Sequence, residues 1–245
     1  AFVLPSTLVF EHPSARRIHA FIADGIATGQ TSDRVVLHPS SDAARSTAES
    51  ISLQGASSAL PMGVSTCDDV ATMGACGSDI VGLVPLSRWD GSALGISDQL
   101  VAARVHHGAF VRGVELFDHA FFAITPSEAG AMDPQQRLLL ERGYDALAAA
   151  SFTKESLLDT PTAVVVAIGT NDFAMILSSL PAGGSVYSAT GSAHSIASGR
   201  VSYVLGLRGP SISVDTACSS GLTACHLSMS ALRHHECSTA LISGV

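Results

Sequence analysis

Positive charge is scarce in this chain. Lys and Arg number 13 against 21 Asp and Glu, which gives the 245 residues a net charge of -8. Binding to a phosphate backbone needs clustered cations, so this balance argues against a nucleic-acid partner. No uninterrupted apolar run reaches the length that spans a bilayer, and the first residues, with Glu11 and Arg16 among them, do not follow the signal-peptide pattern. We therefore expect neither nucleic-acid binding nor a membrane span.

Cysteine is also sparse, and its spacing shows no pairing. The five cysteines are an odd number and lack the spacing of metal ligands, so neither a disulfide framework nor a zinc site is expected. The Gly pair at 183–184 lacks the Lys-Ser/Thr that follows in a nucleotide-phosphate loop. We expect this chain to bind no metal and no cofactor of its own. A reducing compartment fits best, which favours the cytoplasm and leaves an organelle open.

The chain is rich in apolar residues. Its composition is 47% hydrophobic and 14% charged, which is typical of an α/β protein with much of its backbone inside. The continuous β-branched and apolar run from Thr162 to Ile168 predicts a strand buried on both faces, and hence a parallel central sheet. Further strands are expected near 51–55, 211–216 and 240–245, and a helix over 68–76.

Two helix starts stand before the buried strand. Thr125 is placed to cap the first, with Pro126 at the first helical position and Glu128 closing a capping box. Asp133 and Pro134 repeat the arrangement. The second helix is expected to carry Leu140, Tyr144 and Leu147 on one face, which predicts that this face packs on the sheet.

The stretch 211–221 (SISVDTACSSG) predicts a strand, a sharp turn and a helix on which Leu222, Leu227, Met229 and Leu232 recur. Cys218 then stands at the helix start, where unpaired backbone N–H groups and the positive end of the helix dipole favour the thiolate over the thiol. Gly221, one turn on, leaves room for another segment to approach closely. The alternative is an ordinary buried thiol. Local physics leaves both interpretations open.

Five ungapped runs of the sequence carry a resemblance to a single protein family. They are VPLSRWD at 84–90, MDPQQRLLLE at 132–141, YSATG at 187–191, SGRVSYVLGLRGP at 198–210 and VDTACSS at 214–220. In this order they resemble the β-ketoacyl synthase domain of modular polyketide synthases. The sequence departs from that family at Ser58, Ala59 and Leu60, where Cys-Arg-Phe is usual, and at Ala71, where an aromatic is common.

The resemblance implies a fold, a reaction and partners. The fold would be α/β, the first half of the thiolase-like fold, truncated at the C-terminus. Cys218 would take the growing acyl chain as a thioester, and decarboxylative Claisen condensation would join it to a malonyl-type extender. The extender would be carried by the phosphopantetheine of a partner acyl carrier protein. The resemblance also implies a homodimer that pairs through the strand before the cysteine.

Condensation further needs histidines that stabilise the carbanion or enolate. His226 lies eight residues along the helix from Cys218, about 12 Å away, which is too far to share a proton. His234 and His235 lie farther still, and His194 is predicted to be polar surface; His106, His107 and His119 have no spacing that points at Cys218. In the resembled family the two catalytic histidines come from a second half of the fold.

We therefore expect residues 1–245 alone to form an acyl-enzyme at most. We also expect apolar surface at Thr162 to Ile168 and at Ala240 to Val245 to be exposed, because the second half would cover it.

The first residues carry a separate resemblance. The run LPSTLVFEHPSARRIHAFI at 4–22 is similar to the last part of an acyl carrier protein domain, whose phosphopantetheine-bearing serine would lie upstream. It predicts a helix after Pro13 with Ile18, Phe21 and Ile22 at helical spacing. An amphipathic helix of the following domain is the alternative.

We expect three parts in the chain. Residues 1–23 form the end of the carrier domain, 24–50 a linker poor in large apolar groups, and 51–245 the N-terminal part of the synthase domain.

Three rival functions stay open at this point. A thiolase-type or simple acyltransferase would use the same cysteine, and a non-catalytic domain would only dock carrier proteins. A cysteine protease would need a histidine partner and an oxyanion hole, and the flanking residues do not resemble one.

Overall fold

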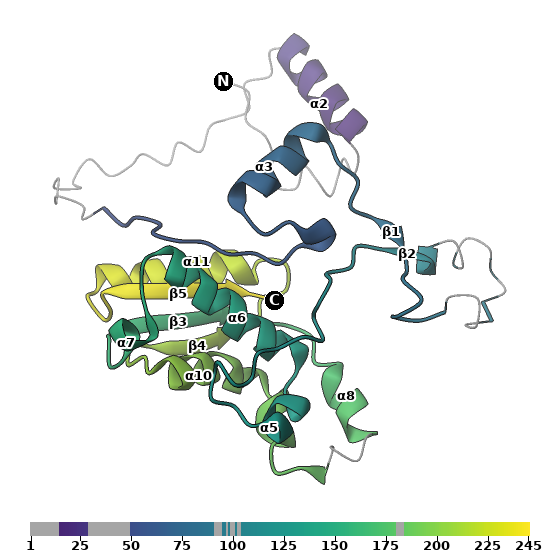
Figure 1. Ribbon diagram of the computed structural model, residues 1–245. Coiled ribbons are helices and arrows are strands. Elements are labelled where there is room, and N and C mark those ends of the chain that lie inside the picture. The colour runs from purple at the N-terminus through teal and green to yellow at the C-terminus, as the bar shows by residue number, and fades with distance from the viewer. Residues whose placement is uncertain are drawn as a thin grey trace. The chain divides into compact units, whose positions relative to one another are not determined.

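The computed structural model of the chain describes residues 15–28, 50–90, 95–96, 98, 101, 104–179 and 184–245. The contacts divide the chain into two units, Ala1–Ala48 and Glu49–Val245. In the first unit the structure describes helix α2, Ala15–Thr28, on which Ile18, Phe21 and Ile22 are half-buried (Figure 1). The expected helix is present, and it runs on past residue 23 into the range assigned to the linker. Pro13 lies outside the described residues.

The second unit mixes helices and strands along its whole length. In chain order its described elements are η1 (Pro61–Gly63), α3 (Cys67–Cys76), β1 (Gly82–Leu83), β2 (His107–Gly108), α5 (Pro126–Ala131), α6 (Pro134–Ala149), α7 (Lys154–Leu157), β3 (Thr162–Ala167), α8 (Phe173–Ser178), α9 (Ser188–Ser192), α10 (His194–Leu205), β4 (Ser211–Val214), α11 (Ser220–Arg233) and β5 (Thr239–Gly244).

The main sheet has the order β4-β3-β5, and both pairings are parallel. Val164 pairs with Ser211 on one side of β3, and Thr162 pairs with Thr239 on the other. Every residue of β3 is buried. A parallel strand hydrogen-bonded on both edges and covered on both faces needs an unbroken apolar sequence, which this segment has. The predictions of strands at 162–168, 211–216 and 240–245 and of a parallel sheet are confirmed; β3 and β4 are slightly shorter than predicted, and β5 begins and ends one residue earlier.

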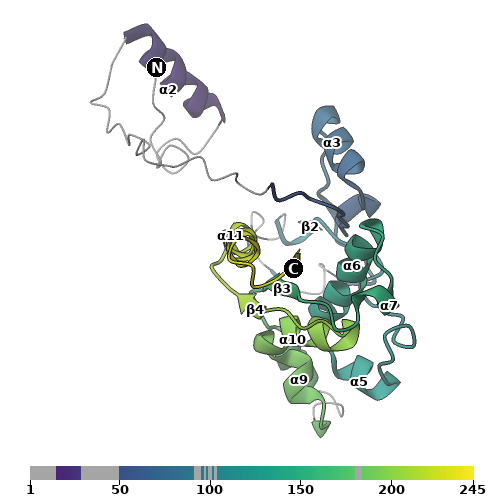
Figure 2. The same cartoon turned by 90° about the vertical axis from the view of Figure 1, so that its left-hand side faces the viewer.

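Helices cover both faces of this sheet. Residues Val164, Val166 and Ile168 belong to the core that includes Leu140 of α6 and Val201 of α10. The residues between them on β3 pack instead with small side chains of α11, such as Ala224 and Ala231. Figure 2 shows α11 on one side of the strands and α6 and α10 on the other. The alternation of β3 side chains therefore supplies two separate cores from one strand.

This double cover contradicts one expectation. The run from Thr162 to Ile168 is buried, so the predicted exposure of apolar surface there is wrong. At the sheet edge the prediction holds in part, because Leu241 is buried while Ile242 and Val245 are exposed. Helices of the same unit already cover the central strand, and the two edge strands keep open apolar surface at Ile212 of β4 and Ile242 of β5.

The two predicted helix starts are present. The hydroxyl of Thr125 accepts the amide of Glu128 (3.2 Å) at the start of α5, and the carboxylate of Asp133 accepts the amide of Gln135 (2.8 Å) at the start of α6. The Glu128 side chain does not close the predicted capping box. It pairs instead with Arg200 of α10, because a buried guanidinium attracts a carboxylate more strongly than an exposed helix amide does.

The segment before residue 90 differs from the prediction. Residues 51–55 form no strand: Leu53 is 86% exposed, and a Cβ built at Gly55 would lie 2.3 Å from the carbonyl oxygen of Ala146 on α6. Alternating residues make a strand only where a sheet edge pairs with them, and this segment lies against a helix. The helix predicted over 68–76 is present as α3, with a capping box between Thr66 and Asp69.

Candidate active site

The turn between β4 and α11 is short and conformationally unusual. It contains five residues, and Ala217 has a φ of 55°, in the left-handed region that residues with a Cβ rarely adopt. Cys218 follows directly and is exposed, whereas Cys237 is buried. The alternative of a buried packing thiol is therefore wrong for Cys218. The thiol stands at the tip of a sharp turn, accessible to a reagent or substrate.

Side chains on both flanks of the cysteine hold this turn. The Asp215 carboxylate accepts the amide of Ala217 (2.9 Å), and the Ser220 hydroxyl accepts the amide of Thr216 (2.7 Å). The same Ser220 hydroxyl donates to the carbonyl of Ala217 (2.8 Å). A strained backbone persists only where its surroundings fix it, and these bonds fix the peptide before Cys218. No sequence pattern points to Asp215 or Ser220 individually, although both lie within the matched run VDTACSS.

The start of α11 is arranged to attract negative charge. Ser219 is the N-cap residue, but its hydroxyl donates to the carbonyl of Thr216 (2.8 Å) instead of accepting from the helix amides. First-turn amides of a helix have no intrahelical partner and carry the positive end of its dipole. Cys218 lies two residues before the first helical residue, so a negative charge that develops there would lie near the positive end of this dipole.

The predicted helix is present as α11, which packs through small residues and through two of its recurring leucines, Leu227 and Leu232. Its buried residues are Ser220, Ala224, Ser228 and Ala231, whereas Leu222 is 78% exposed. Small side chains let the helix lie close to β3. The close approach expected at Gly221 is not made by the described residues, since a Cβ built there has no described atom within 4 Å.

A second loop leaves the sheet beside the cysteine turn. The amide of Ile168, just after β3, bonds the carbonyl of Val214 at the end of β4 (3.1 Å). A Cβ built at Gly169 would lie 4.0 Å from the Asp215 carboxylate. Parallel strands bring their carboxyl ends to one edge, so the residues 169–171 form a wall next to the turn that carries Cys218.

Two side chains from other elements fix this loop. The carbonyl of Thr170 accepts Nε2 of Gln135 (2.8 Å) and Nε2 of His194 (3.1 Å). His194, predicted as polar surface, is half-buried and occupied by this contact. Its spacing from Thr170 carries no sequence signal, because the pairing depends on the packing of α10 beside the sheet.

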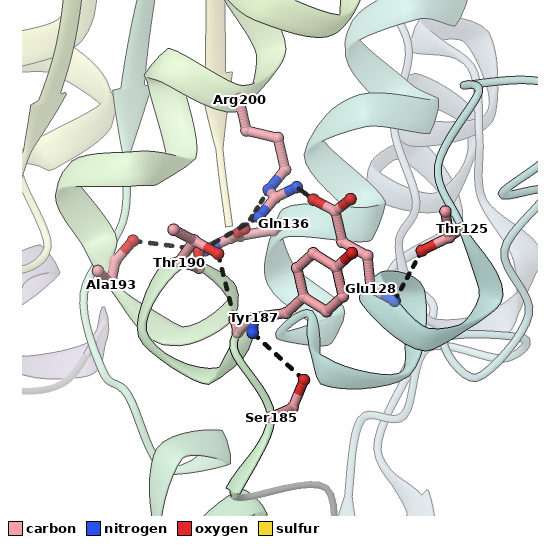
Figure 3. Close-up of polar contacts among 8 residues, drawn as sticks. All are labelled: Thr125, Glu128, Gln136, Ser185, Tyr187, Thr190, Ala193 and Arg200. Carbon is pink, nitrogen blue, oxygen red and sulfur yellow. Dashed lines mark hydrogen bonds and ion pairs between the residues drawn. The ribbon is translucent and has the colours of Figure 1, made fainter.

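A buried polar cluster lies between α5, α6 and α10 (Figure 3). Nε of Arg200 donates to the side-chain oxygen of Gln136 (2.7 Å), and the guanidinium forms an ion pair with Glu128. An open hollow of about 390 Å³ adjoins the cluster and is lined in part by Tyr187 and Tyr203. Spacing along the chain gives no signal for this cluster, because Gln136 and Glu128 lie 64 and 72 residues from Arg200.

Comparison with known proteins now decides the family. The model of the "Beta-ketoacyl synthase, N-terminal domain" matches residues 48–245, most of the chain. The chain belongs to the β-ketoacyl synthase family. The expectation of an α/β thiolase-like fold, drawn from five short runs, is thereby confirmed.

Relatives of this synthase domain are polyketide synthases. It is 40% identical over 246 residues to mycoketide-CoA synthase of Mycobacterium tuberculosis, a match that covers 99% of this chain and 6% of that protein. It is 38% identical over 244 residues to polyketide synthase GfsB of Streptomyces halstedii, covering 98% of this chain and 4% of that one. The chain therefore spans only a small part of these relatives.

Solved structures agree with this assignment. A ketosynthase domain of the oxazolomycin synthase from Streptomyces albus JA3453 superposes with a TM-score of 0.68 at 30% identity, over 79% of this chain and 33% of that one. The ketosynthase from module 6 of the bacillaene synthase of Bacillus subtilis 168 gives a TM-score of 0.65 at 31% identity, over 78% and 30%. The chain spans about a third of each ketosynthase.

The remaining histidines of the synthase domain have local partners or face solvent. Nδ1 of His119 contacts the carbonyl of Ile124 (2.9 Å), and Nδ1 of His234 contacts that of Ser230 (2.8 Å). His226 is exposed on α11. In the part of the chain that the structure describes, no cluster of three His, Cys, Asp or Glu side chains is placed to hold a metal ion. No described helix has the length and apolar character to cross a membrane.

The other cysteines differ from Cys218 in their surroundings. Burial raises the pKa of the Cys237 thiol, an effect that a hydrogen bond with the backbone of Ala163 only partly offsets. Cys225 is half-buried on α11, and Cys67 and Cys76 are exposed at the two ends of α3. These residues provide internal controls for the reactivity of Cys218.

Proposed function

We propose that Cys218 is the acyl-accepting nucleophile of a polyketide synthase condensing domain, of which this chain is the N-terminal part. The observation that carries the proposal is the placement of an exposed thiol on a strained turn, two residues before a helix whose N-cap hydroxyl accepts none of the first amides. Such a position suits a nucleophile that must be reached by a substrate and whose acyl oxygen gains negative charge during transfer.

The substrate is an acyl thioester on the phosphopantetheine arm of an acyl carrier protein. The sulfur of Cys218 attacks the thioester carbonyl, a new C–S bond forms, and the carrier thiol leaves with the proton that the cysteine loses. The positive end of the α11 dipole would stabilise negative charge that develops at the reacting centre. The product of this step is an acyl-enzyme joined through Cys218.

Chain extension then consumes the acyl-enzyme. A malonyl-type extender on the carrier loses CO2, its α-carbon attacks the Cys218 thioester, and the cysteine thiol is released as the β-ketoacyl chain passes to the carrier. The family resemblance assigns the histidines for decarboxylation to a second half of the fold. We propose that residues 1–245 by themselves stop at the acyl-enzyme.

The domain plan and the oligomeric state belong to the same proposal. Residues 1–23 would end a preceding carrier domain, 24–50 would link it, and 51–245 would begin the synthase. A homodimer is supported by β4, which is an edge strand of the described sheet and leaves Ile212 40% exposed. The free thiols of the chain suit a reducing compartment such as the cytoplasm. Sedimentation of the complete domain tests the dimer, and an active monomer would refute it.

Acyl transfer is tested on the full reading frame that contains this chain. An acyl thioester donor should add its acyl group to the peptide that carries Cys218, read by mass spectrometry. Cys218→Ala should abolish the adduct, whereas Cys225→Ala, two helical turns on, should leave it. With malonyl carrier protein present, the wild type should then release a β-ketoacyl product. Acylation elsewhere, or persistence of the adduct in Cys218→Ala, would overturn the proposal.

A further inference from the structure

Arg200 is the most deeply buried charged residue of the cluster in Figure 3, at 8% exposure, and Gln136 beside it is 2% exposed. Buried charge is costly unless every donor is used, so a guanidinium in such a place requires partners on several sides. It contacts Glu128, Gln136 and the carbonyl of Thr190 (3.4 Å). These partners belong to α5, α6 and α9, so one side chain on α10 connects four helices.

The cluster around Arg200 donates hydrogen bonds to backbone carbonyls at the end of α9. Gln136, held through its oxygen by Arg200, donates from Nε2 to the carbonyls of Thr190 (3.2 Å) and Ala193 (3.4 Å). The last carbonyls of a helix have no partner within the helix and need one from outside. Arg200 and Gln136 supply partners at both ends of this four-residue junction.

The two carbonyls between them are also bound from outside. The amide of Asp133 donates to the carbonyl of Gly191 (2.9 Å), and Nδ2 of Asn171 donates to that of Ser192 (2.5 Å). Four successive carbonyls, residues 190–193, are thus held by groups of α6, α10 and the loop after β3. We call residues 190–193 the α9–α10 junction.

The junction is connected to the wall beside Cys218. Asn171, which bonds the junction at Ser192, belongs to the loop 169–171, and His194, the first residue of α10, holds Thr170 of the same loop. That loop lies against Asp215, whose carboxylate fixes the turn before Cys218. A shift at the junction would therefore move the wall next to the thiol without touching the thiol itself.

We propose that Arg200 is a positioning residue for acyl transfer to Cys218: through Gln136 and the α9–α10 junction it fixes the loop 169–171 that flanks the cysteine turn. This role rests on the proposed function. The planar fork of arginine reaches Glu128, Gln136 and the Thr190 carbonyl at once, which the single ammonium of lysine does not. Arg200→Lys keeps the buried charge and its pairing with Glu128 but releases Gln136 and the junction.

The experiment compares Arg200→Lys with Arg208→Lys in the full reading frame. Arg208 pairs with Asp159 (2.8 Å), but the side chains of this pair are 72% and 76% exposed, and it serves as the matched ion-pair control. Arg200→Lys should lower kcat/KM for acylation of Cys218 by an acyl thioester about tenfold, because a displaced wall misaligns the bound acyl group. Alkylation of Cys218 by iodoacetamide, a probe that needs no acyl site, should change less than about twofold. Arg208→Lys should change neither rate.

Hydrogen exchange of the backbone amides tests, independently of catalysis, whether Arg200 fixes the loop 169–171. In Arg200→Lys the peptides covering 169–171 and 190–193 should exchange faster, while a peptide from β5 stays as in the wild type. Unchanged exchange at 169–171, or an equal loss of acylation and alkylation with lowered overall stability, would overturn the positioning role. A wild type that takes no acyl group at Cys218 would overturn the proposed function instead, and the exchange data would still decide whether Arg200 fixes the loop.

Discussion

The two ends of the synthase match, residues 50–90 and 114–245, belong to one family model but are built very differently. The later region has a strand buried along its whole length and helices on both faces. In the earlier region α3 has no buried residue, and Leu83 and Leu86 are 72% and 84% exposed. Family membership alone therefore does not determine how much core a segment forms.

Small side chains are one contribution to this difference, although large ones such as Leu83 and Leu86 are exposed there too. Ser58, Ala59 and Leu60 stand where the family usually has Cys-Arg-Phe, and Ala71 replaces a common aromatic. Small side chains remove apolar area that would anchor a helix, at about 25 cal/mol for each Å². Where Leu and β-branched residues recur, as on α6 and β3, the core is complete.

The largest expected contrast comes from truncating one apolar side chain in each region. Leu140→Ala, at a fully buried position, should cost about 2–5 kcal/mol of unfolding free energy, because it removes apolar contacts and leaves a cavity. Val70→Ala on α3, 39% exposed, should cost less than about 0.5 kcal/mol.

Urea unfolding followed by far-ultraviolet circular dichroism reports mainly on the later region, which contains most of the described helices and strands, and the fluorescence of Trp89, the single tryptophan, reports on the earlier region. We expect the fluorescence transition at lower urea. One coincident transition for both probes would show that the two regions unfold together as one cooperative unit.

Adding a methyl group at the α9–α10 junction should have the next largest effect. A Cβ at Gly191 would lie 2.0 Å from the carbonyl oxygen of Ala131, so Gly191→Ala should cost about 1–3 kcal/mol or force the junction apart. Gly199→Ala, on α10 with no described atom within 4 Å of the added Cβ, should stabilise the helix by about 0.5–1 kcal/mol. Equal effects of the two substitutions in denaturant titrations would argue against the tight packing of this junction.

The comparison of the two regions extends to two carboxyl groups whose pKa values shift in opposite directions, Glu141 in the later region and Asp69 in the earlier one. Burial raises the pKa of Glu141 on α6, which means that the folded state binds this proton more tightly than the unfolded state. Stability should therefore fall as pH rises from the ordinary glutamate pKa through the raised one. Glu141→Gln should increase stability at pH 7, and the gain should disappear at a pH below both values. A gain that is equal at both pH values would contradict burial as its cause.

Asp69 on α3 should behave in the reverse way and with a smaller effect. The hydroxyl of Thr66 and the amides of Ser65 and Thr66 lower the pKa of its carboxyl group. Its contribution is present above the ordinary aspartate pKa and is lost as pH falls through the lowered one. Asp69→Asn should weaken α3 at pH 7 and have no effect at a pH below the lowered pKa, as measured by amide exchange of the α3 peptide. If Asp69→Asn still weakens α3 at low pH, the ionised carboxylate of Asp69 is not the cause of the effect.

Sequence reasoning was accurate where local chemistry determines the result. Thr125 and Asp133 cap helices because their side chains bond amides two or three residues on, and the apolar run at 162–168 needs no distant information to indicate a buried strand. The turn around Cys218 was also predictable, since a strand and a helix flank it closely.

Distant pairing was not predictable in the same way. The residues 51–55 alternate like a strand but lie against α6, and Glu128 leaves its capping role for Arg200, 72 residues away. The fully buried face of α11 carries small residues, while Leu227 and Leu232 are only partly buried and Leu222 is exposed, because closeness to β3 outweighs apolar area there. Each of these outcomes depends on a partner that spacing along the chain does not reveal.

The central claim is that position on the turn, and not exposure alone, makes Cys218 the reactive thiol. Competitive alkylation of the folded complete domain with limiting iodoacetamide, followed by peptide mass spectrometry, measures the reactivity of all the cysteines together. We predict that Cys218 reacts first, that the similarly exposed Cys67 and Cys76 react more slowly, and that Cys237 reacts last because burial raises its pKa. Labelling of Cys67 or Cys76 at the rate of Cys218 would contradict the account.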